Sequence, residues 1–266
     1  MKVCLYPICS DLQPYVKAIC SIESDTTDTI LAPLRILPDA CVEVFFNFSN
    51  SGDTHATVTG KKEFHNSRSF VVSRVGNFMD VQMKSKTGFI SVCFYPSTAY
   101  LFFQLPMSAI ADSLTDLQFL WGTVVQTIED EIDNATSCMQ KVGIIQKYLI
   151  RQLKANKQDT TLEYCLQQIA CAQSMLTVAA LAEKAGLSQR QLSRRFNYCI
   201  GLSTKEYIRI SRFINSLAYL KKYPESNLTD AAYASGYYDQ AHFIHDYKTF
   251  AGITPKAVLL DTNIIC

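Results

Sequence analysis

The sequence predicts an α+β protein in which a β-rich N-terminal domain precedes an all-helical C-terminal domain. Apolar residues alternate in several runs between about residues 28 and 95, and beyond them the apolar period lengthens to three or four residues. Two segments near the C-terminus repeat one pattern of short helix, turn and second helix. With 266 residues, 48% of them hydrophobic, the chain can bury the cores of two domains of ordinary size.

Strict alternation predicts the strands of the N-terminal domain. Val42, Val44 and Phe46 fall on one face of a β-rich run, opposite the side chains between them. Turn residues at 50–53 separate this run from the next. The pattern is typical of a small barrel or a cupin-like fold with flanking helices. Further β-rich runs are residues 69–75 and 89–95.

Apolar residues at helical spacing predict two helices after the strands, over residues 123–133 and 137–153. The following residues, 154–160, are polar and lack periodicity, as is typical of an interdomain linker. Everything after the linker has helical character. The predicted domains are residues 1–155, a β-rich effector-binding or dimerisation domain, and residues 160–266, a helical domain.

Composition and cysteine spacing exclude several classes of protein. The net charge of +1 and the many apolar residues exclude intrinsic disorder, and no apolar run is long enough to span a membrane. The N-terminus lacks a secretory signal pattern, so a cytoplasmic location is predicted. Ten cysteines occur without a CxxC pair, so free thiols are expected rather than disulfides or zinc ligands. Residues 174–266 carry 11 Lys and Arg against 7 Asp and Glu, which is compatible with nucleic acid binding at this end.

The C-terminal domain is predicted to contain two helix-turn-helix units with a capped long helix between them. In the first unit, Thr177 caps a short helix that ends at Gly186, and Ser188 opens the second helix with a capping-box pattern. About fifty residues further on, Gly236 and Asp239 repeat the turn and the cap. In each second helix, an apolar pair four residues apart is expected to be buried. These pairs are Leu192 with Phe196 and Phe243 with Tyr247.

Several motifs make the helical part specific, namely Gly186–Ser188, Leu192–Phe196, Lys205–Ile210, Ser235–Tyr237, Asp239–Phe243 and Lys248–Pro255. With them, about residues 162–260 resemble the DNA-binding domain of AraC/XylS-type transcriptional regulators, which carries two helix-turn-helix units joined by a linker helix. The sequence departs from the family pattern at Thr204, where Pro is usual, and at Tyr237 and Tyr247, where Phe is usual. The N-terminal part is similar to the sensor-type domain that precedes this module in a subset of such regulators, over Leu34–Val44 and Leu120–Gly122.

The resemblance implies that the second helix of each unit enters a major groove of duplex DNA with its N-terminal half towards the bases. In the first unit, Arg190, Ser193 and Arg194 would project outwards. Gln189 and Gln191 would lie near the entry. Arginine can pair with two guanine acceptors and so specify sequence, whereas phosphate contacts only position the protein. Phosphate contacts are expected from Arg195, Lys205 and Arg209, and contacts of the second unit from Gln240, Ala241 and His245.

The two recognition helices are expected to contribute unequally. The first carries three arginines, whereas the second carries none and offers His245 together with Asp246, which would repel phosphate if it lay near the DNA backbone. Asp239 is assigned to capping. The first helix should therefore supply most base discrimination, and the second should add affinity or thymine-methyl contacts through Ala241. Acidification should strengthen binding because it charges His245.

The predicted function is that of a sequence-specific DNA-binding transcription regulator that responds to an unknown effector. Its expected partners are double-stranded DNA, a small-molecule effector, RNA polymerase and a second copy of the chain, without a cofactor and without a membrane. The alternative is a small-molecule-binding protein or an enzyme of the β-rich domain with an accessory helical DNA-binding module. No nucleophile elbow, phosphate loop or paired-carboxylate motif occurs in the sequence, so neither a catalytic residue nor an enzyme is predicted.

Two further kinds of site are weighed and disfavoured. His55 and His65 have nine residues between them, unlike the His-x-His pair of a cupin metal site, so no metal site is predicted. A DNA-repair methyl acceptor fused to the same helical module would need four clustered cysteines. The N-terminal cysteines are dispersed instead.

Overall fold

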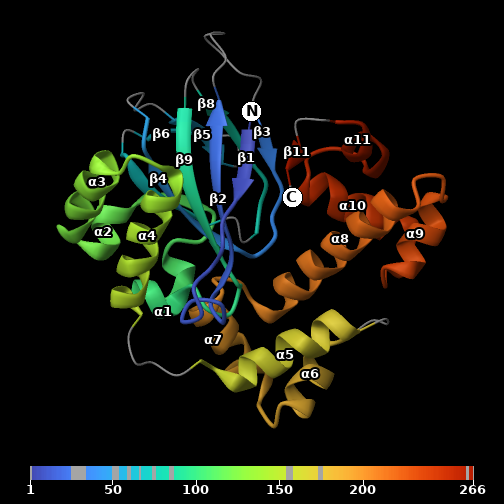
Figure 1. Cartoon of the computed structure of the whole chain (residues 1–266). Helices are drawn as coiled ribbons and strands as arrows, with labels where there is room; N and C mark the ends of the chain where they lie inside the picture. The colour runs from blue at the N-terminus through green and yellow to red at the C-terminus, as the bar shows by residue number, and fades with distance from the viewer. Residues whose placement is uncertain are drawn as a thin grey trace.

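The computed structural model has an antiparallel, sheet-rich N-terminal region followed by a helical C-terminal region, as the sequence predicts (Figure 1). The predicted turn at residues 50–53 and most of the predicted linker, residues 154–157, lie outside the described residues. The structure describes residues 2–24, 34–49, 54–58, 61–65, 67–73, 76–83, 87–153, 158–172, 176–261 and 264–265.

The strands form two sheets. The first is antiparallel throughout and has the order β1 (Lys2–Leu5), β2 (Val16–Ser24), β9 (Thr87–Phe94), β4 (Val42–Asn47), β7 (Ser69–Ser73) and β10 (Ser113–Asp116). The second has the order β11 (Ile264–Ile265), β3 (Leu34–Ile36), β8 (Met79–Met83), β5 (Thr54–Val58) and β6 (Lys61–His65). In this second sheet β11 pairs with β3 in parallel and the other pairs are antiparallel.

The first sheet is covered on both faces, and β7 and β9 are therefore buried along their whole length. On one face, Val44 and Phe46 of β4 pack in the core shared with the helices that follow the sheet, which confirms the alternation predicted for this strand. On the other face, Phe70 and Phe89 meet Met79 of the second sheet. The two sheets thus lie against each other with an aromatic layer between them.

Helices cover the outer face of the first sheet and build the C-terminal region (Figure 1). Those beside the sheet are α1 (Tyr100–Phe103), the short 3-10 helix η1 (Met107–Ala109), α2 (Leu117–Trp121), α3 (Val124–Asn134) and α4 (Cys138–Gln152). The C-terminal helices are α5 (Thr160–Cys171), α6 (Val178–Lys184), α7 (Gln189–Cys199), α8 (Thr204–Lys222), α9 (Leu228–Ala234), α10 (Gln240–Phe250) and α11 (Pro255–Leu260). The two helices predicted over residues 123–133 and 137–153 are confirmed as α3 and α4.

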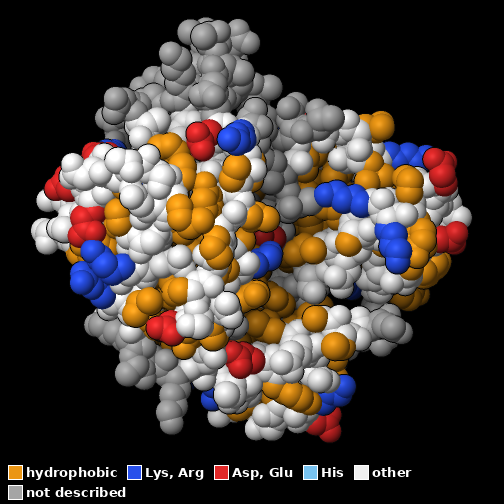
Figure 2. All heavy atoms as spheres, viewed as in Figure 1, with side chains coloured by type: hydrophobic (Ala, Val, Ile, Leu, Met, Phe, Trp, Pro, Cys, Tyr) orange, Lys and Arg blue, Asp and Glu red, His pale blue; other side chains and the backbone are white. Residues whose placement is uncertain are grey.

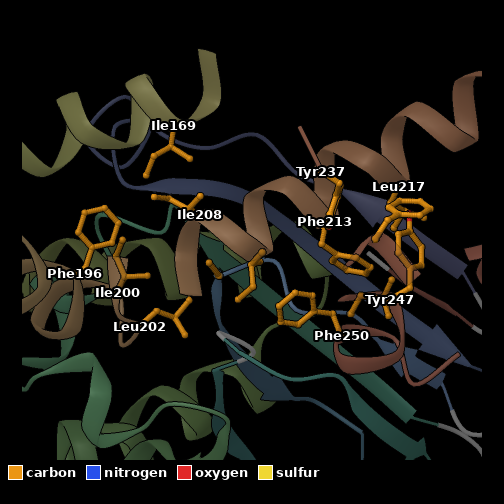
Figure 3. Packing of buried hydrophobic residues seen from close by; sticks show 14 of the residues in the cluster. Ile169, Phe196, Ile200, Leu202, Ile208, Phe213, Leu217, Tyr237, Tyr247 and Phe250 are labelled. Carbon is orange, nitrogen blue, oxygen red and sulfur yellow. The ribbon is translucent and has the colours of Figure 1, made fainter. Parts of the chain in front are cut away.

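Helix α8 joins two packed groups of side chains, one towards each of its ends (Figure 3). Phe196, Ile200 and Ile208 belong to the group at its N-terminal end, and Phe213 and Tyr247 belong to the other. The apolar pairs predicted to be buried are fully buried in the structure. These are Leu192 with Phe196 on α7 and Phe243 with Tyr247 on α10.

The N-terminal and C-terminal parts also share structure that the sequence analysis missed. Strand β11, next to the end of the chain, pairs with β3 of the N-terminal part. Leu37 belongs to the hydrophobic core of the C-terminal helices. Arg35 on β3 pairs with Asp80 at 2.7 Å and donates a 3.1 Å hydrogen bond to the carbonyl of Ala251, which follows α10. Contacts therefore cross the predicted domain boundary at several places.

The sequence analysis also made predictions about the cysteines, a membrane span and a metal site. All nine cysteines in the described part of the chain carry free thiols, and four of them are buried: Cys41, Cys93, Cys165 and Cys199. Within the described ranges, no helix combines the length and the apolar character needed to cross a bilayer. The side chains of His55 and His65 are not among those described, so the expectation about a metal site stays a prediction.

Candidate nucleic-acid interface

The first helix-turn-helix unit consists of α6, a turn at Gly186 and α7. Gly186 has a φ of 65°, a left-handed conformation that glycine adopts without steric cost. The Ser188 hydroxyl accepts a 3.2 Å hydrogen bond from the Gln191 backbone N–H, and the Gln191 side chain accepts one of 2.9 Å from the Ser188 N–H. This capping box begins α7 at the predicted residue and fixes the angle at which it leaves the turn.

Helix α7 buries one side in the core and leaves a polar side to solvent. Leu192 and Phe196 face inwards. Arg190 and Arg194 lie on the opposite side and are exposed, so the structure leaves both guanidinium groups accessible for base contacts. Of the other predicted residues on this helix, Gln189 and Gln191 are exposed and Ser193 is half-buried.

Arg195 differs from the other two arginines of α7. It forms an ion pair with Asp159, which also accepts a 3.0 Å hydrogen bond from the Leu162 N–H and so caps α5. Asp159 lies within the predicted linker, and the sequence analysis gave it no role. A phosphate contact from Arg195 therefore has to compete with the Asp159 carboxylate.

The C-terminal end of α7 lies against the N-terminal part of the chain. The ring of Tyr198 meets that of Tyr100 of α1 edge-on, with the ring centres 6.0 Å apart. Burial raises the pKa of the Cys199 thiol and that of the Tyr100 hydroxyl each to about 12. A hollow of about 560 Å³ beside this contact is lined by Pro106 and by Arg194. The first recognition helix thus borders the N-terminal part along one flank.

The second unit repeats the first with different residues. Asn227 caps α9, Gly236 makes the turn with a φ of 78°, and the Asp239 carboxylate accepts a 2.7 Å hydrogen bond from the His242 N–H at the start of α10. The capping role predicted for Asp239 is therefore confirmed. The residues predicted to face outwards on α10, namely Gln240, Ala241 and His245, are all exposed.

The linker helix α8 carries the remaining predicted contacts. Lys205, in its first turn, is exposed. Arg209 donates a 2.6 Å hydrogen bond to Asp246 of α10, and the Asp246 side chain has no exposed surface. The condition for repulsion of phosphate by Asp246 is thus not met, because its carboxylate is buried and paired with Arg209.

The net charge of the chain does not by itself indicate a nucleic-acid-binding face. The net charge is only +1, and on the face shown in Figure 2 the basic and acidic side chains of the described residues are interspersed. The described residues of this face therefore do not form a broad positive patch.

Comparison with known protein families decides what this arrangement is. The model described as "Helix-turn-helix domain" matches residues 181–260, which run from α6 to the end of α11. This stretch is a helix-turn-helix domain of the AraC type. The AraC-type domain makes the chain a DNA-binding transcription regulator. The model described as "Domain of unknown function (DUF6597)" matches residues 6–116, in the sheet-rich part.

Several solved structures are similar to the chain that carries this AraC-type domain. ToxT from Vibrio cholerae O395 is 13% identical, with a TM-score of 0.47 over 91% of this chain and 96% of that chain. The C-terminal domain of the response regulator yesN from Fusobacterium nucleatum subsp. nucleatum is 27% identical, with a TM-score of 0.35 over 37% and 97%. The AraC-like transcriptional activator CuxR is 15% identical, with a TM-score of 0.28 over 88% and 90%. No curated protein sequence matches the chain.

The structure brings most of the predicted residues to the surface of the AraC-type domain and adds some that the sequence analysis missed. Asp159 binds Arg195, and Asp246 holds Arg209. Arg212 of α8 lies at the junction of the two units, where its Nη1 donates a 3.4 Å hydrogen bond to the Gly236 carbonyl. Its spacing from Arg209, three residues on one helix, was the available signal for its position.

Proposed function

We propose that this chain binds duplex DNA in a sequence-specific manner through α7 and α10 and regulates transcription in response to an effector of its N-terminal part. The observation that carries the proposal is the pair of exposed arginines, Arg190 and Arg194, on the outward side of a capped α7. A guanidinium that reaches the O6 and N7 atoms of guanine discriminates by about 1–3 kcal/mol against other bases. Helix α10, with Ala241 and His245 outward, would add affinity and fewer base contacts.

Selection of bound sequences from a random duplex pool by the full chain tests this proposal. The change Arg194→Ala should relax base preference at one or two positions, while Arg151→Ala on α4, outside the helix-turn-helix units, is a control that removes the same group. If the wild-type chain enriches no sequence at low salt, sequence-specific binding is wrong. If substitutions under α10 in the selected site cost more than those under α7, the proposed ranking of the two helices is overturned.

The regulatory half of the proposal rests on the contact between the N-terminal part and α7. Tyr100 meets Tyr198, so a ligand that displaces α1 or η1 would move or release the recognition helix. The change Tyr198→Ala should alter the affinity of the full chain for its selected duplex. Unchanged affinity in this variant would contradict coupling through this contact. RNA polymerase and a second copy of the chain stay predicted partners.

A further inference from the structure

A cleft of about 560 Å³ separates the two helix-turn-helix units. Its floor is α8, one wall is the start of α6, and the other wall is α10. The residues that line it include Leu176, Thr177 and Val178 on the α6 side, which carry no charge. The remaining lining side chains are mostly basic: Lys205, Arg209, Arg212, His242 and His245.

Charge in the cleft is one-sided. Three permanent cations line it, and two histidines add charge when protonated. The acid in contact with this group is Asp246, which is fully buried beneath Arg209 and has its second carboxylate oxygen 3.9 Å from His242 Nε2. Asp246 therefore holds Arg209 by a hydrogen bond, and its carboxylate has no exposed surface that could contact a group entering the cleft.

Arg212 is the best-placed donor in this group. Its guanidinium lies over the ring of Tyr237, 5.2 Å from the ring centre, and its Nη1 reaches the Gly236 carbonyl only at 3.4 Å. Its Nε is buried and has no hydrogen-bond partner among the described residues. A planar guanidinium held by a ring is suited to paired hydrogen bonds with a phosphate group, and the outer nitrogens of Arg212, rather than its buried Nε, are the donors for them.

The position of the cleft indicates where such a phosphate comes from. Lys205, Arg209 and Arg212 recur every three or four residues and so share one side of α8. Tyr207 points to the other side, where burial and the nearby Cys41 and Asp39 of the N-terminal part raise its pKa. The cleft thus opens away from the N-terminal part and lies between the start of α6 in the first unit and α10 in the second.

His245 links the cleft to the DNA-facing surface. It is exposed on the outward side of α10 and also lines the cleft. At the other end of the cleft, Lys205 lies in the first turn of α8, which is the next helix after α7 in the sequence. A duplex that contacts both recognition helices must carry its backbone across the space between them.

We propose that this cleft binds a backbone phosphate of the duplex between the two half-sites, with Arg212 and Lys205 as its main donors. The proposal rests on the proposed function, because the phosphate is supplied by DNA already engaged by α7 and α10. A free phosphate or pyrophosphate ion offers the same chemistry and is separated from the duplex by the experiment.

The test measures the salt dependence of the dissociation constant of the full chain for its selected duplex and for a scrambled one. Lys205→Gln and Arg212→Gln remove cleft cations, and Lys222→Gln at the far end of α8 is the matched control. Each cleft variant should weaken binding to both duplexes alike and lower the salt slope by about 1, so that its defect shrinks about fourfold between 50 and 200 mM salt. Lys222→Gln should behave as the wild type.

Lys205 is exposed, so its variant tests the cleft even if Arg212→Gln disturbs the fold. Wild-type salt slopes in Lys205→Gln and in a folded Arg212→Gln would overturn the proposal while DNA binding stands. Titration of the chain with pyrophosphate distinguishes the free ion. Pyrophosphate binding that both variants abolish, with salt slopes unchanged, would assign the cleft to a free anion and also overturn the proposal. A wild-type chain that binds neither duplex would instead refute the proposed function itself.

Discussion

The Arg209 guanidinium on the linker helix donates a 2.6 Å hydrogen bond to Asp246 on the second recognition helix, and the Asp246 side chain is wholly buried. Arg209 also lies over the ring of Phe250, 5.2 Å from its centre. These contacts fix α10 against α8, so the spacing of the two recognition helices depends on a charged pair inside the domain.

Removal of Arg209 is expected to destabilise the protein more than removal of the Asp246 charge. Arg209→Met leaves a buried carboxylate without its cation, which costs about 3–5 kcal/mol, whereas Asp246→Asn leaves an arginine that water still reaches. Urea unfolding of both single variants and of the double variant measures the coupling between the two residues. Losses that simply add in the double variant would show that the pair is not coupled.

A second ion pair is expected to restrain DNA binding. Asp159→Asn keeps a capping oxygen for α5 but removes the charge that holds Arg195. DNA affinity should rise by at most about fivefold, and equally for all sequences, because a partly exposed ion pair is worth about 0–1 kcal/mol. Affinity measured at low salt checks this. Asp130→Asn on α3 changes the net charge equally, and an equal rise in that variant would contradict a specific role for Asp159.

The sequence predicted the helix-turn-helix units well because their signals are local. Ser188 and Asp239 are caps that act on backbone groups three residues away, and Gly186 and Gly236 mark left-handed turns. Each helix boundary therefore followed from a few neighbouring residues. The alternation of buried and half-buried residues in β4 could be predicted for the same reason, because it depends on neighbouring residues of one strand.

The roles of Asp246 and Asp159 could not be read in this way. Asp246 lies at the edge of the apolar stripe of α10, and the ion pair with Arg209, 37 positions earlier, makes its burial favourable. Asp159 meets Arg195 only when α5 and α7 are packed. The pairing of β11 with β3 joins the C-terminal strand to a strand of the N-terminal part. All three contacts depend on how distant segments pack together, which local sequence patterns do not reveal. The two ion pairs also engage Arg195 and Arg209, which the sequence analysis had assigned to phosphate contacts.

Gly201, between α7 and α8, is expected to be critical for the contact with the N-terminal part. It has a φ of 93°, and a β-carbon there would lie 3.0 Å from the carbonyl oxygen of Met107 in η1. Gly186 has a φ of 65° and open space around the same position, so Gly186→Ala should cost only the backbone strain of about 1–2 kcal/mol. Gly201→Ala should cost more, because η1 must also move away. If urea unfolding gives the same loss of stability for Gly201→Ala and Gly186→Ala, the close approach of Gly201 to Met107 does not contribute to the cost of the substitution.

Alkaline pH is expected to destabilise the junction of α7 with the N-terminal part. Burial and, to a lesser degree, the Asp159 charge raise the pKa of the Cys199 thiol to about 12 from an ordinary value of 9.0. The folded state therefore holds this proton more tightly than the unfolded chain does. The resulting stability is fully present below about pH 9 and is lost as the pH rises towards 12.

Urea unfolding in the presence of a phosphine reductant, at steps between pH 8 and pH 11, measures this loss. The midpoint should fall with pH in the wild type, and it should fall less steeply in Cys199→Ala, which has no thiol to titrate at this position. Comparison of slopes rather than midpoints removes the packing that the alanine variant loses at every pH. Cys171→Ala removes an exposed thiol and should keep the wild-type slope. If Cys199→Ala retains the full slope as well, the buried thiol is not what makes this junction sensitive to alkali, and the Tyr100 hydroxyl, whose pKa burial also raises to about 12, becomes the group to replace.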